Sequence, residues 1–537
     1  MRSRQASSAG RLCGSLRPGL PAALVLALVT LAPGCRAEQA VNREPLPQAP
    51  PAPDVLTHWP VPEPPAVTAE RPVLWVALAA HLGPKAASSA ATTLPLVLTA
   101  ATGTIDVVDA AGRRVSAPRL ELRWRAEPLP RPLRLRRTVL GPFPSFETAE
   151  QAALSWRQQG VEPRIAHPAD WEVWAPADTP APPGHTARAE SQQLTARIGL
   201  VLASPGGPKP LQGPLEIRVP GGLRWGDGVF RGPFRLQSNA YGSWSLVEQV
   251  PLERYLQGVV PHEIGAGAPA AALAAQAVLA RTWALRNSHR FAVDGYHLCA
   301  DTQCQVYGDP RQAGPAVRAA ITTTAGRVLS WQGRPIHAVY HATNGGVAAG
   351  FEEVWRGEPL PYLQAFADGP APFVAAYPLP LDPARALPAL LQRAAPAGYG
   401  ADHPRYRWQR RLDRQQIRQA LGPAARTLGE VRQLAVLERG PSGRVLALAI
   451  TGSAGRQVLR LDGIRRSLRQ LPSTLFSVSP EGPGVWRFSG GGFGHGAGLS
   501  QAGAIDLAAR GWSLERILAR YYPGTALVPI GGLGNGP

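Results

Sequence analysis

Alternating apolar and polar positions run through two long parts of the chain and predict β-strands in both. In residues 71–135 the runs VLWVALAA, LPLVLTA and LELRWRAE alternate in this way. Alternation of period two is typical of strands with one buried face. Short strand-like runs return from about residue 193, and further strands are expected over 327–342. The chain is therefore predicted to consist mainly of strands.

Helical patterns are fewer. The clearest covers residues 269–290, PAAALAAQAVLARTWALRNSHR, with a proline at its start and alanine throughout. Both features favour a helix. Shorter helical patterns cover 382–395 and 413–421, and another begins near Ser500. We therefore predict an α+β fold, in which a large domain with an Ala-rich helix and further helices follows a smaller α+β region.

Residues 137–175 form a compact strand–helix–strand pattern within that smaller region. A strand is followed by a turn at Gly141, and Ser145 or Thr148 can cap the next helix, which Gly160 ends. The pattern resembles a SPOR-type repeat, a module that binds peptidoglycan glycan strands. An ordinary α+β element would give the same pattern.

The first residues carry several arginines and an apolar run, Leu20–Leu31, that is too short to span a membrane. This combination is typical of a secretory signal peptide, here residues 1–37. Cys35 stands where a lipoprotein would be cleaved, although Cys35-Arg36-Ala37 also offers an ordinary cleavage site. We expect export to the periplasm or cell envelope, with peripheral or lipid-anchored membrane attachment at most. Proline-rich residues 38–70 are predicted to form a linker.

Composition changes this picture in two respects. The chain has 537 residues, enough for two to four domains, and its 14 Trp and 45% hydrophobic content argue against wholesale disorder despite 57 Gly and 57 Pro. The net charge of +19 excludes an acidic surface and favours an anionic or sugar-polymer partner. Because the chain is expected to be exported and its arginines look scattered, no nucleic-acid partner is expected.

Glu263 is the strongest candidate for acid–base chemistry. It follows the apolar segment YLQGVV and precedes the Ala-rich helix. A carboxyl group among apolar neighbours such as Ile264 can have a raised pKa, as a general acid requires. An exposed glutamate at a helix entrance explains the pattern equally well. No clear second carboxylate partner for Glu263 is visible in the sequence.

Other motifs exclude some chemistries. The stretch Gly490–Gly498 lacks the G-x-G-x-x-G spacing of a dinucleotide site. Ser500, in GLSQA, has no histidine after it, which the residue order of α/β-hydrolases requires. His297, Cys299 and Cys304 could supply three ligands of a structural zinc, the two cysteines could form a disulfide, or they could stay a reduced pair. The residues alone leave these three alternatives open, with zinc and the disulfide favoured equally.

Four blocks, in order, resemble the SpoIID/LytB family of stage II sporulation protein D and the amidase-enhancer protein. They are YLQGVVPHEIGAGAPAAALAAQAVLARTWALRN, HLCADTQCQVY, YHATNGGVAAGFEEVW and FGHGAGLSQAGAIDLAARGWSLERILARYYPGT. The resemblance implies a domain over residues 191–530, preceded by the smaller region at 71–190. The sequence departs from the family where His262 replaces a small residue, Trp283 a tyrosine and Ala502 another tyrosine.

The resemblance implies a lytic transglycosylase that cleaves peptidoglycan glycan strands to 1,6-anhydro products. Glu263 would be its single catalytic acid and base, and no cofactor would be required. Substrate binding would fall to a set of polar residues, although Ser500 is also suited to cap a helix: Arg281, His341, His495, Ser500 and Gln501. The enhancer branch implies an alternative, a non-catalytic wall-binding protein that stimulates an N-acetylmuramoyl-L-alanine amidase.

Overall fold

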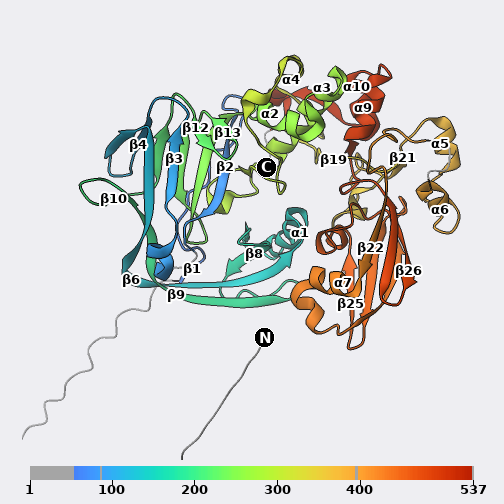
Figure 1. Cartoon of the computed structure of the whole chain (residues 1–537), viewed down its shortest axis with the longest axis horizontal. Coiled ribbons are helices and arrows are strands. Elements are labelled where there is room, and N and C mark those ends of the chain that lie inside the picture. Colours follow the sequence, from blue (N-terminus) through green and yellow to red (C-terminus); the bar gives the residue numbers. More distant parts are fainter. Residues whose placement is uncertain (1–53, 85–86, 393–396, 535–537) are drawn as a thin grey trace, which may run out of the picture. The chain divides into compact units, whose positions relative to one another are not determined.

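Two large β-sheets form the first half of the chain in the computed structural model of this protein, which describes residues 54–84, 87–392 and 397–534 (Figure 1). The predicted signal peptide, the candidate anchor Cys35 and residues 38–53 of the predicted linker lie outside the described residues. The rest of that linker contacts the fold, since β1 (Asp54–Val55) pairs with β6 and the carbonyl of Pro65 accepts a hydrogen bond from His297.

The larger sheet is built on two long antiparallel strands, β6 (Arg119–Phe143) and β9 (Ala187–Leu202). Its central strand order is β10-β9-β6-β3-β12-β13. The predicted domain boundary at residue 190 falls inside β9, which pairs with β6 on both sides of that point. The remaining strands of this order are β3 (Leu96–Ala100), β10 (Lys209–Leu211), β12 (Leu223–Trp225) and β13 (Gly228–Phe230).

The second sheet has the order β16-β2-β15-β14-β11-β4-β5. Its edge strand β16 (Leu298–Cys299) runs parallel to β2 (Val73–Leu82), so the segment that bears the cysteines is part of the sheet. The other strands are β4 (Ile105–Val108), β5 (Arg114–Ala117), β11 (Leu215–Arg218), β14 (Phe234–Ser238) and β15 (Trp244–Pro251).

Both sheets and the following helices share one buried core. Leu98 and Trp124 from the first 190 residues belong to the same apolar cluster as Leu256 and Leu279 from the helices. Residues 71–190 therefore do not have a separate core. Alternation along the chain identifies strands, but it does not show which strands will pair or which core they share.

The strand–helix–strand pattern predicted at 137–175 is present. Helix α1 (Phe146–Arg157) begins after Ser145, whose hydroxyl accepts a hydrogen bond from the Thr148 amide, and strands β7 (Arg164–Ala166) and β8 (Trp171–Pro176) follow. Trp156 and other side chains of this region pack in one cluster with Cys299. The region is thus fixed against the cysteine segment, and its relation to SPOR repeats stays a prediction.

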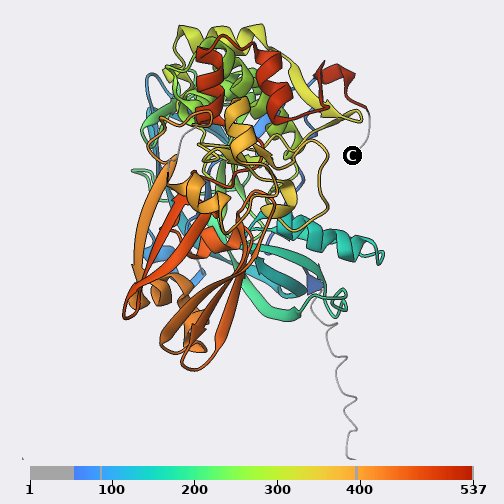
Figure 2. The ribbon, with the colours of Figure 1, turned by 90° about the vertical axis from the view of Figure 1, so that its right-hand side faces the viewer.

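Five helices pack together although they come from distant parts of the chain. Figures 1 and 2 show α9 and α10 beside α2, α3 and α4. Alanine side chains are small enough for close packing around α3, most of whose residues are buried. The helices are α2 (Leu252–Val260), α3 (Ala270–Arg286), α4 (Pro315–Thr323), α9 (Gln501–Ala509) and α10 (Leu514–Tyr521).

Short elements link these helices. Strands β19 (Tyr340–His341) and β28 (Leu499–Ser500) pair in parallel, which places two of the family-like blocks side by side. The strands expected over 327–342 and the helix expected over 382–395 are shorter than predicted. These and neighbouring elements are β17 (Arg327–Trp331), β18 (Arg334–Pro335), β20 (Val347–Ala348), β21 (Phe366–Ala367), α5 (Ala371–Ala376), α6 (Ala386–Leu391) and β29 (Ala526–Pro529).

Residues 407–491 form what we call the β22–β27 module, which has its own core around residues such as Ile417 and Phe488. One sheet has the order β22-β27-β26 and the other β23-β24-β25. The elements are β22 (Arg407–Asp413), α7 (Arg414–Leu421), η6 (Gly422–Arg426), β23 (Val431–Arg439), β24 (Val445–Gly452), β25 (Arg456–Arg460), α8 (Gly463–Ser467), β26 (Phe476–Gly482) and β27 (Val485–Gly491).

The predicted α+β fold class, with strands prevailing and an Ala-rich helix in the large domain, is confirmed. Among the described residues, no helix combines the length and the apolar character that crossing a lipid bilayer would need.

Candidate active site

Glu263 lies on an irregular turn between two buried helices. Helix α2 leads into the π-helical turn η2 (Pro261–Gly265), and α3 begins a few residues later. Gly265 has φ of +86°, a value that suits glycine, and it ends the turn. A π-helical turn changes the direction of side chains relative to a regular helix and is frequent at functional sites. The local backbone thus presents Glu263 apart from the packed faces of α2 and α3.

Two hydrogen-bond donors hold the Glu263 carboxyl group. The Val306 amide donates to Oε1 over 2.9 Å, and the Tyr340 hydroxyl is a second partner. Burial raises the pKa of Glu263 above its ordinary value, and the two donors offset part of that effect because they favour the anion. A half-buried carboxyl with a raised pKa can hold a proton and give it up to a substrate.

Gln305 connects the segments around Glu263. Its Oε1 accepts a hydrogen bond from the Tyr255 hydroxyl of α2 over 3.0 Å, and its Nε2 donates to the Tyr340 hydroxyl over 2.9 Å. Burial raises the pKa of Tyr340 well above its usual range, so its hydroxyl stays protonated and can donate to Glu263. The Gln305 side chain therefore sets the orientation of Tyr340, a residue that the sequence alone did not indicate as part of the site.

Cys299 and Cys304 form a disulfide that closes the loop just before Gln305. His297 does not face them as a ligand, because its Nδ1 accepts from the Trp75 amide over 2.8 Å and its Nε2 donates to the Pro65 carbonyl over 2.9 Å. Burial lowers the pKa of His297 to about 4. The structure thus contains the disulfide alternative, and among its described residues no cluster of three His, Cys, Asp or Glu is placed to hold a metal ion.

A pocket of about 230 Å³ opens at Glu263. Residues from several distant regions line it, among them α1, the Glu263 turn, α3, the disulfide loop, β19 and the β22–β27 module. Its polar and aromatic lining includes Glu147, Glu263, Trp283, Arg290, Gln305, Tyr340, Trp355, Asp462, Arg465, Arg466 and His495. Trp283, one of the departures from the family pattern, is part of this wall.

Two further carboxylates, which sequence reasoning missed as partners of the site, lie in the pocket. Glu147 pairs with Arg290, and Asp462 pairs with Arg465 and Arg466 over 2.9 and 3.1 Å. Burial opposes their ionisation, yet the arginines lower the pKa of Glu147 below its ordinary value and that of Asp462 to about 2. Of the three carboxyl groups that line the pocket, Glu263 is the one whose pKa is raised.

His495 lines the pocket, but both of its ring nitrogens are engaged with backbone. Nε2 donates to the Tyr340 carbonyl over 2.9 Å, and Nδ1 accepts from the Ala497 amide over 3.2 Å. Burial lowers its pKa to about 4, so the ring is neutral. Its ring centroid lies 5.0 Å from that of Trp355. His495 can therefore offer a ring surface and fix the position of Tyr340.

His341 lies behind His495, with ring centroids 5.2 Å apart. It is buried, its Nδ1 bonds to the Ala497 carbonyl over 3.1 Å, and burial lowers its pKa well below its usual range. His341 does not line the pocket. The structure thus places it as a neutral side chain that supports the Gly-rich loop.

Ser500 and Gln501 also lie behind the site. The Ser500 hydroxyl accepts from the Gly503 amide over 3.1 Å and caps α9, and the Gln501 amide donates to the Gln276 side chain of α3 over 3.2 Å. Both side chains are buried and neither lines the pocket. These contacts stabilise α9 and join it to α3. They satisfy both side chains within the protein, so neither residue is placed to contact a substrate in the pocket.

Arg281 is fully buried in α3 and pairs with Glu253 over 2.6 Å. It also donates to the Arg327 carbonyl over 3.0 Å. The structure therefore brings Arg281 to Glu253 and not to Glu263. The position of Arg281 along α3 does not predict Glu253 as its partner, because Glu253 lies on the separate helix α2.

His262, the departure next to Glu263, has room because residue 308 is glycine. A Cβ atom at Gly308 would lie 2.4 Å from the His262 ring. The ring Nδ1 bonds to the Gly258 carbonyl over 2.8 Å. The larger residue is thus accommodated without displacing the turn that bears Glu263.

Two family models and several known proteins match parts of this chain. The family model for stage II sporulation protein matches residues 240–331, and a domain of unknown function, DUF8618, matches residues 349–498. The chain is 28% identical over 296 residues to stage II sporulation protein D of Bacillus amyloliquefaciens, covering 52% of this chain and 74% of that protein. It is 29% identical over 299 residues to the amidase enhancer of Bacillus subtilis, covering 51% of this chain and 40% of that protein.

The matched region contains α2, the Glu263 turn, α3 and the disulfide loop. The predicted resemblance to the SpoIID/LytB family is thereby confirmed over about half of the chain.

Replacing Ser500 by alanine separates a capping role from a substrate-binding role. We expect Ser500→Ala to lower the free energy of unfolding by about 1 kcal/mol through the lost cap, with binding to purified cell walls unchanged. Thermal unfolding and a cell-wall binding assay measure the two effects. Ser513→Ala, which removes the matching cap of α10, is the control. A several-fold loss of cell-wall binding for Ser500→Ala alone would contradict the capping assignment.

Proposed function

We propose that this protein is a peptidoglycan lytic transglycosylase in which Glu263 is the single catalytic acid and base. The observation that carries the proposal is the contrast within one pocket. Burial raises the pKa of Glu263, whereas Glu147 and Asp462 are ionised and paired with arginines. A glycosidase with two catalytic carboxylates needs a second one that is free to act as nucleophile or base. A transglycosylase can work with one.

The proposed reaction has two proton transfers. Protonated Glu263 gives its proton to the oxygen of the glycosidic bond after muramic acid, and that bond breaks. The muramic acid C6 hydroxyl then attacks C1, and the Glu263 carboxylate takes the hydroxyl proton, which restores the acid and leaves a 1,6-anhydro ring. An internal hydroxyl held close to C1 has a high effective concentration and replaces water. The reaction can proceed without a cofactor.

The donors at Glu263 suit the second half of this reaction. Once the proton has left, the Val306 amide and the Tyr340 hydroxyl stabilise the carboxylate anion. Gln305, placed by the disulfide loop, keeps the Tyr340 hydroxyl in position. The disulfide is thus assigned a structural role close to the reacting carboxyl.

Similarity to an amidase enhancer favours one alternative, a non-catalytic wall-binding protein that stimulates an N-acetylmuramoyl-L-alanine amidase. Either function places the protein in the cell envelope, with peptidoglycan glycan strands as its partner. The predicted signal peptide and Cys35 would supply export and, where lipidated, a peripheral anchor. A SPOR-like α1 region would add a second contact with glycan strands.

Glu263→Gln tests the catalytic proposal. The amide cannot donate or recover the proton, so we expect release of 1,6-anhydro-muropeptides from purified sacculi to fall by a factor of about 100 or more. Mass spectrometry of the soluble products measures this. Glu162→Gln, an exposed glutamate outside the pocket, is the matched control and should retain full activity.

Three outcomes are distinct in that experiment. Retained product release by Glu263→Gln contradicts the assignment of Glu263. Absence of products with both the wild type and the variant, together with faster cleavage by an added amidase, supports the enhancer function. Loss of activity in both variants indicates a general effect on folding.

Tyr340→Phe tests how the site sets the pKa of Glu263. A general acid loses activity as the pH rises through its pKa, and the raised pKa of Glu263 places this alkaline limb above about 4.3, the ordinary glutamate value. Because the Tyr340 hydroxyl lowers that pKa, its removal should move the alkaline limb of kcat/KM to higher pH. Loss of one hydrogen bond should also slow the reaction about tenfold.

A tyrosine with only a packing role would lower the rate without moving the limb. Tyr362→Phe is the control, since its hydroxyl accepts a hydrogen bond from the His337 amide and does not line the pocket. A Tyr340→Phe profile that superimposes on the wild-type profile after scaling contradicts the proposed contact.

A further inference from the structure

A second hollow of about 520 Å³ adjoins the Glu263 pocket, between the start of α1 and the β22–β27 module, and we call it the α1 hollow. It shares Trp355, Asp462 and Arg466 with the Glu263 pocket as a common wall. At about 230 Å³, the Glu263 pocket is smaller than the range of about 300–1,000 Å³ that is typical of sites for drug-sized ligands. A disaccharide unit of peptidoglycan has the size of such a ligand, so a glycan strand bound at Glu263 must extend beyond the pocket.

Three segments of the chain line the α1 hollow. One side consists of the end of β6 and the start of α1, and another of the β25–α8 connection and nearby residues of the β22–β27 module. The third segment runs from Glu352, in the short helix η5 (Phe351–Glu353), to Arg356. None of the described residues that line the hollow falls within 240–331, the part that the stage II sporulation protein model matches. The hollow therefore depends on regions outside that match.

The lining of the α1 hollow combines apolar surface with polar groups that have no internal partner. Phe143, Leu446 and Leu461 are only partly buried there. The side chains of Glu352 and Arg356 make no hydrogen bond or ion pair with any other described residue. A sugar ring has an apolar face and a rim of hydroxyl and acetamido groups, so it needs both kinds of contact. This mixture suits sugar rings better than a purely ionic or a purely apolar ligand.

The backbone is strained where the β22–β27 module meets the α1 hollow. Leu461 has φ of +52°, in the left-handed region that leucine rarely adopts. Its amide donates to the Leu446 carbonyl over 2.9 Å, and the next amide, of Asp462, donates to the Val354 carbonyl over 3.1 Å. Such strain persists where the surrounding structure imposes it, and it is frequent at ligand-binding sites. The strained turn places Leu461 in the α1 hollow and Asp462 in the common wall.

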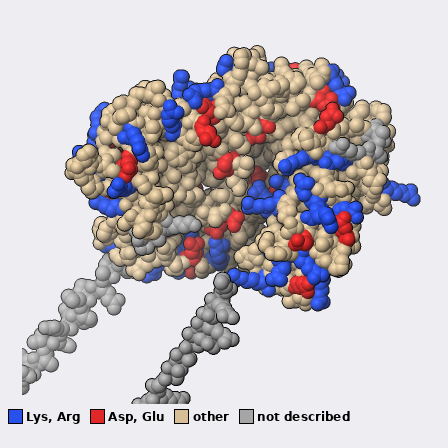
Figure 3. Space-filling model, in the orientation of Figure 1, with Lys and Arg blue, Asp and Glu red and all other residues tan. Residues whose placement is uncertain are grey.

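Much of the positive charge of the β22–β27 module lies elsewhere. Residues 407–491 contain 15 arginines and five Asp or Glu residues, so the expectation that the cations are scattered along the chain is wrong. Figure 3 shows arginines gathered over the part of the surface where Figure 1 places β22, α7 and β25.

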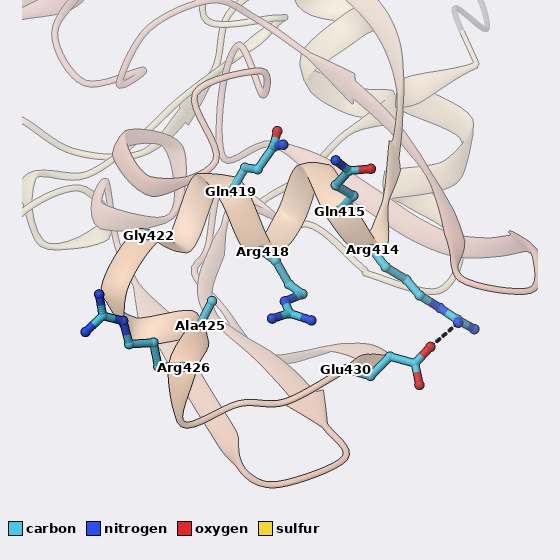
Figure 4. Close-up of a pocket in the computed structure, with 8 residues that line it drawn as sticks. All are labelled: Arg414, Gln415, Arg418, Gln419, Gly422, Ala425, Arg426 and Glu430. Atoms are coloured by element: carbon cyan, nitrogen blue, oxygen red, sulfur yellow. Dashed lines mark hydrogen bonds and ion pairs between the residues drawn. The ribbon is translucent and has the colours of Figure 1, made fainter. Parts of the chain in front are cut away.

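A separate hollow of about 550 Å³ between α7 and η6 contains some of these arginines (Figure 4). Arg418 points into the space between the two helices, whereas Gln415 and Gln419 lie on the other side of α7. Of the described residues that line this hollow, none lines the Glu263 pocket or the α1 hollow. It is therefore not continuous with the Glu263 pocket, and Arg418 can serve as a control.

We infer that the α1 hollow is a second part of the glycan-binding site, which holds N-acetylated sugar units next to those bound at Glu263. The inference rests on the proposed function, since it extends the substrate site of Glu263. A strand that leaves the Glu263 pocket over the partly exposed Arg466 enters the α1 hollow, where Glu352 and Arg356 are free to bind its polar groups. The start of α1 thus forms one wall of the substrate site.

Filling the α1 hollow tests this inference. An added Cβ atom at Gly463 would have Pro144, 4.0 Å away, as its nearest neighbour, so the large side chain of Gly463→Trp can enter the hollow. Affinity is measured in a Glu263→Gln background for a peptide-free tetrasaccharide and octasaccharide prepared from purified peptidoglycan. We expect the parent to bind the octasaccharide about tenfold more tightly than the tetrasaccharide, and Gly463→Trp to abolish this difference.

Two controls should keep the tenfold difference. Gly482→Trp adds the same side chain at an exposed position of the same module, where an added Cβ atom has no described neighbour within 4 Å. Arg418→Gln removes a charge from the separate hollow of Figure 4. A second test variant, Glu352→Ala/Arg356→Ala, removes two side chains without internal partners and should reduce the difference about threefold. If thermal unfolding shows that Gly463→Trp is not folded, this double variant decides.

A length difference that persists in the deciding variant, or an equal loss of affinity for both oligosaccharides, would overturn the inference. Equal binding of both oligosaccharides by the parent, or no binding of either, would overturn it too. Unchanged oligosaccharide binding together with lost stimulation of an added amidase would assign the hollow to a protein partner instead. None of these outcomes depends on product formation, so absence of 1,6-anhydro products from the wild type, which contradicts the proposed function, is recognised separately.

Discussion

The structure around the pocket depends on one constraint: the Glu263 carboxyl group must be buried enough to keep a proton, yet surrounded by donors that stabilise it once the proton has left. Burial raises its pKa, and the Val306 amide and Tyr340 hydroxyl supply the donors. These groups come from three separate segments of the chain. Their convergence requires that the π-helical turn, the disulfide loop and strand β19 be held in fixed relative positions.

Many of the polar residues that the sequence offers as candidates for substrate contacts hold these segments in position instead. The Cys299–Cys304 disulfide places Gln305 and Val306, and β16 anchors the same loop to the second sheet. His495 bonds to the Tyr340 carbonyl, and β28 pairs with the strand that bears Tyr340. The Ser500 side chain caps the start of α9, and the Gln501 side chain joins α9 to α3. Residues that first suggest substrate contacts thus support the few groups that can reach a substrate.

Local features of the structure can be predicted from the sequence. Alternation predicts the strands, alanine content predicts α3, and apolar neighbours indicate Glu263, because each of these patterns depends only on a few adjacent residues. It could not identify Glu253 as the partner of Arg281, or Glu147 and Asp462 as pocket carboxylates, because tertiary packing alone brings these residues together. The predicted domain boundary at residue 190 falls inside β9 for the same reason. The pairing of β9 with β6 joins residues far apart in the sequence, so local patterns do not show it. The excess of arginine in residues 407–491 was readable from the sequence by counting within windows.

In the proposed mechanism, one carboxyl group cleaves the glycan without water as a reactant. Digestion of purified peptidoglycan in water enriched in ¹⁸O, followed by mass spectrometry of the products, tests this mechanism directly. We expect muramic acid ends that lack the mass of one water and carry no ¹⁸O at C1, because the C6 hydroxyl supplies the new bond. Reducing ends that contain one ¹⁸O for each bond cleaved would show hydrolysis and contradict the mechanism.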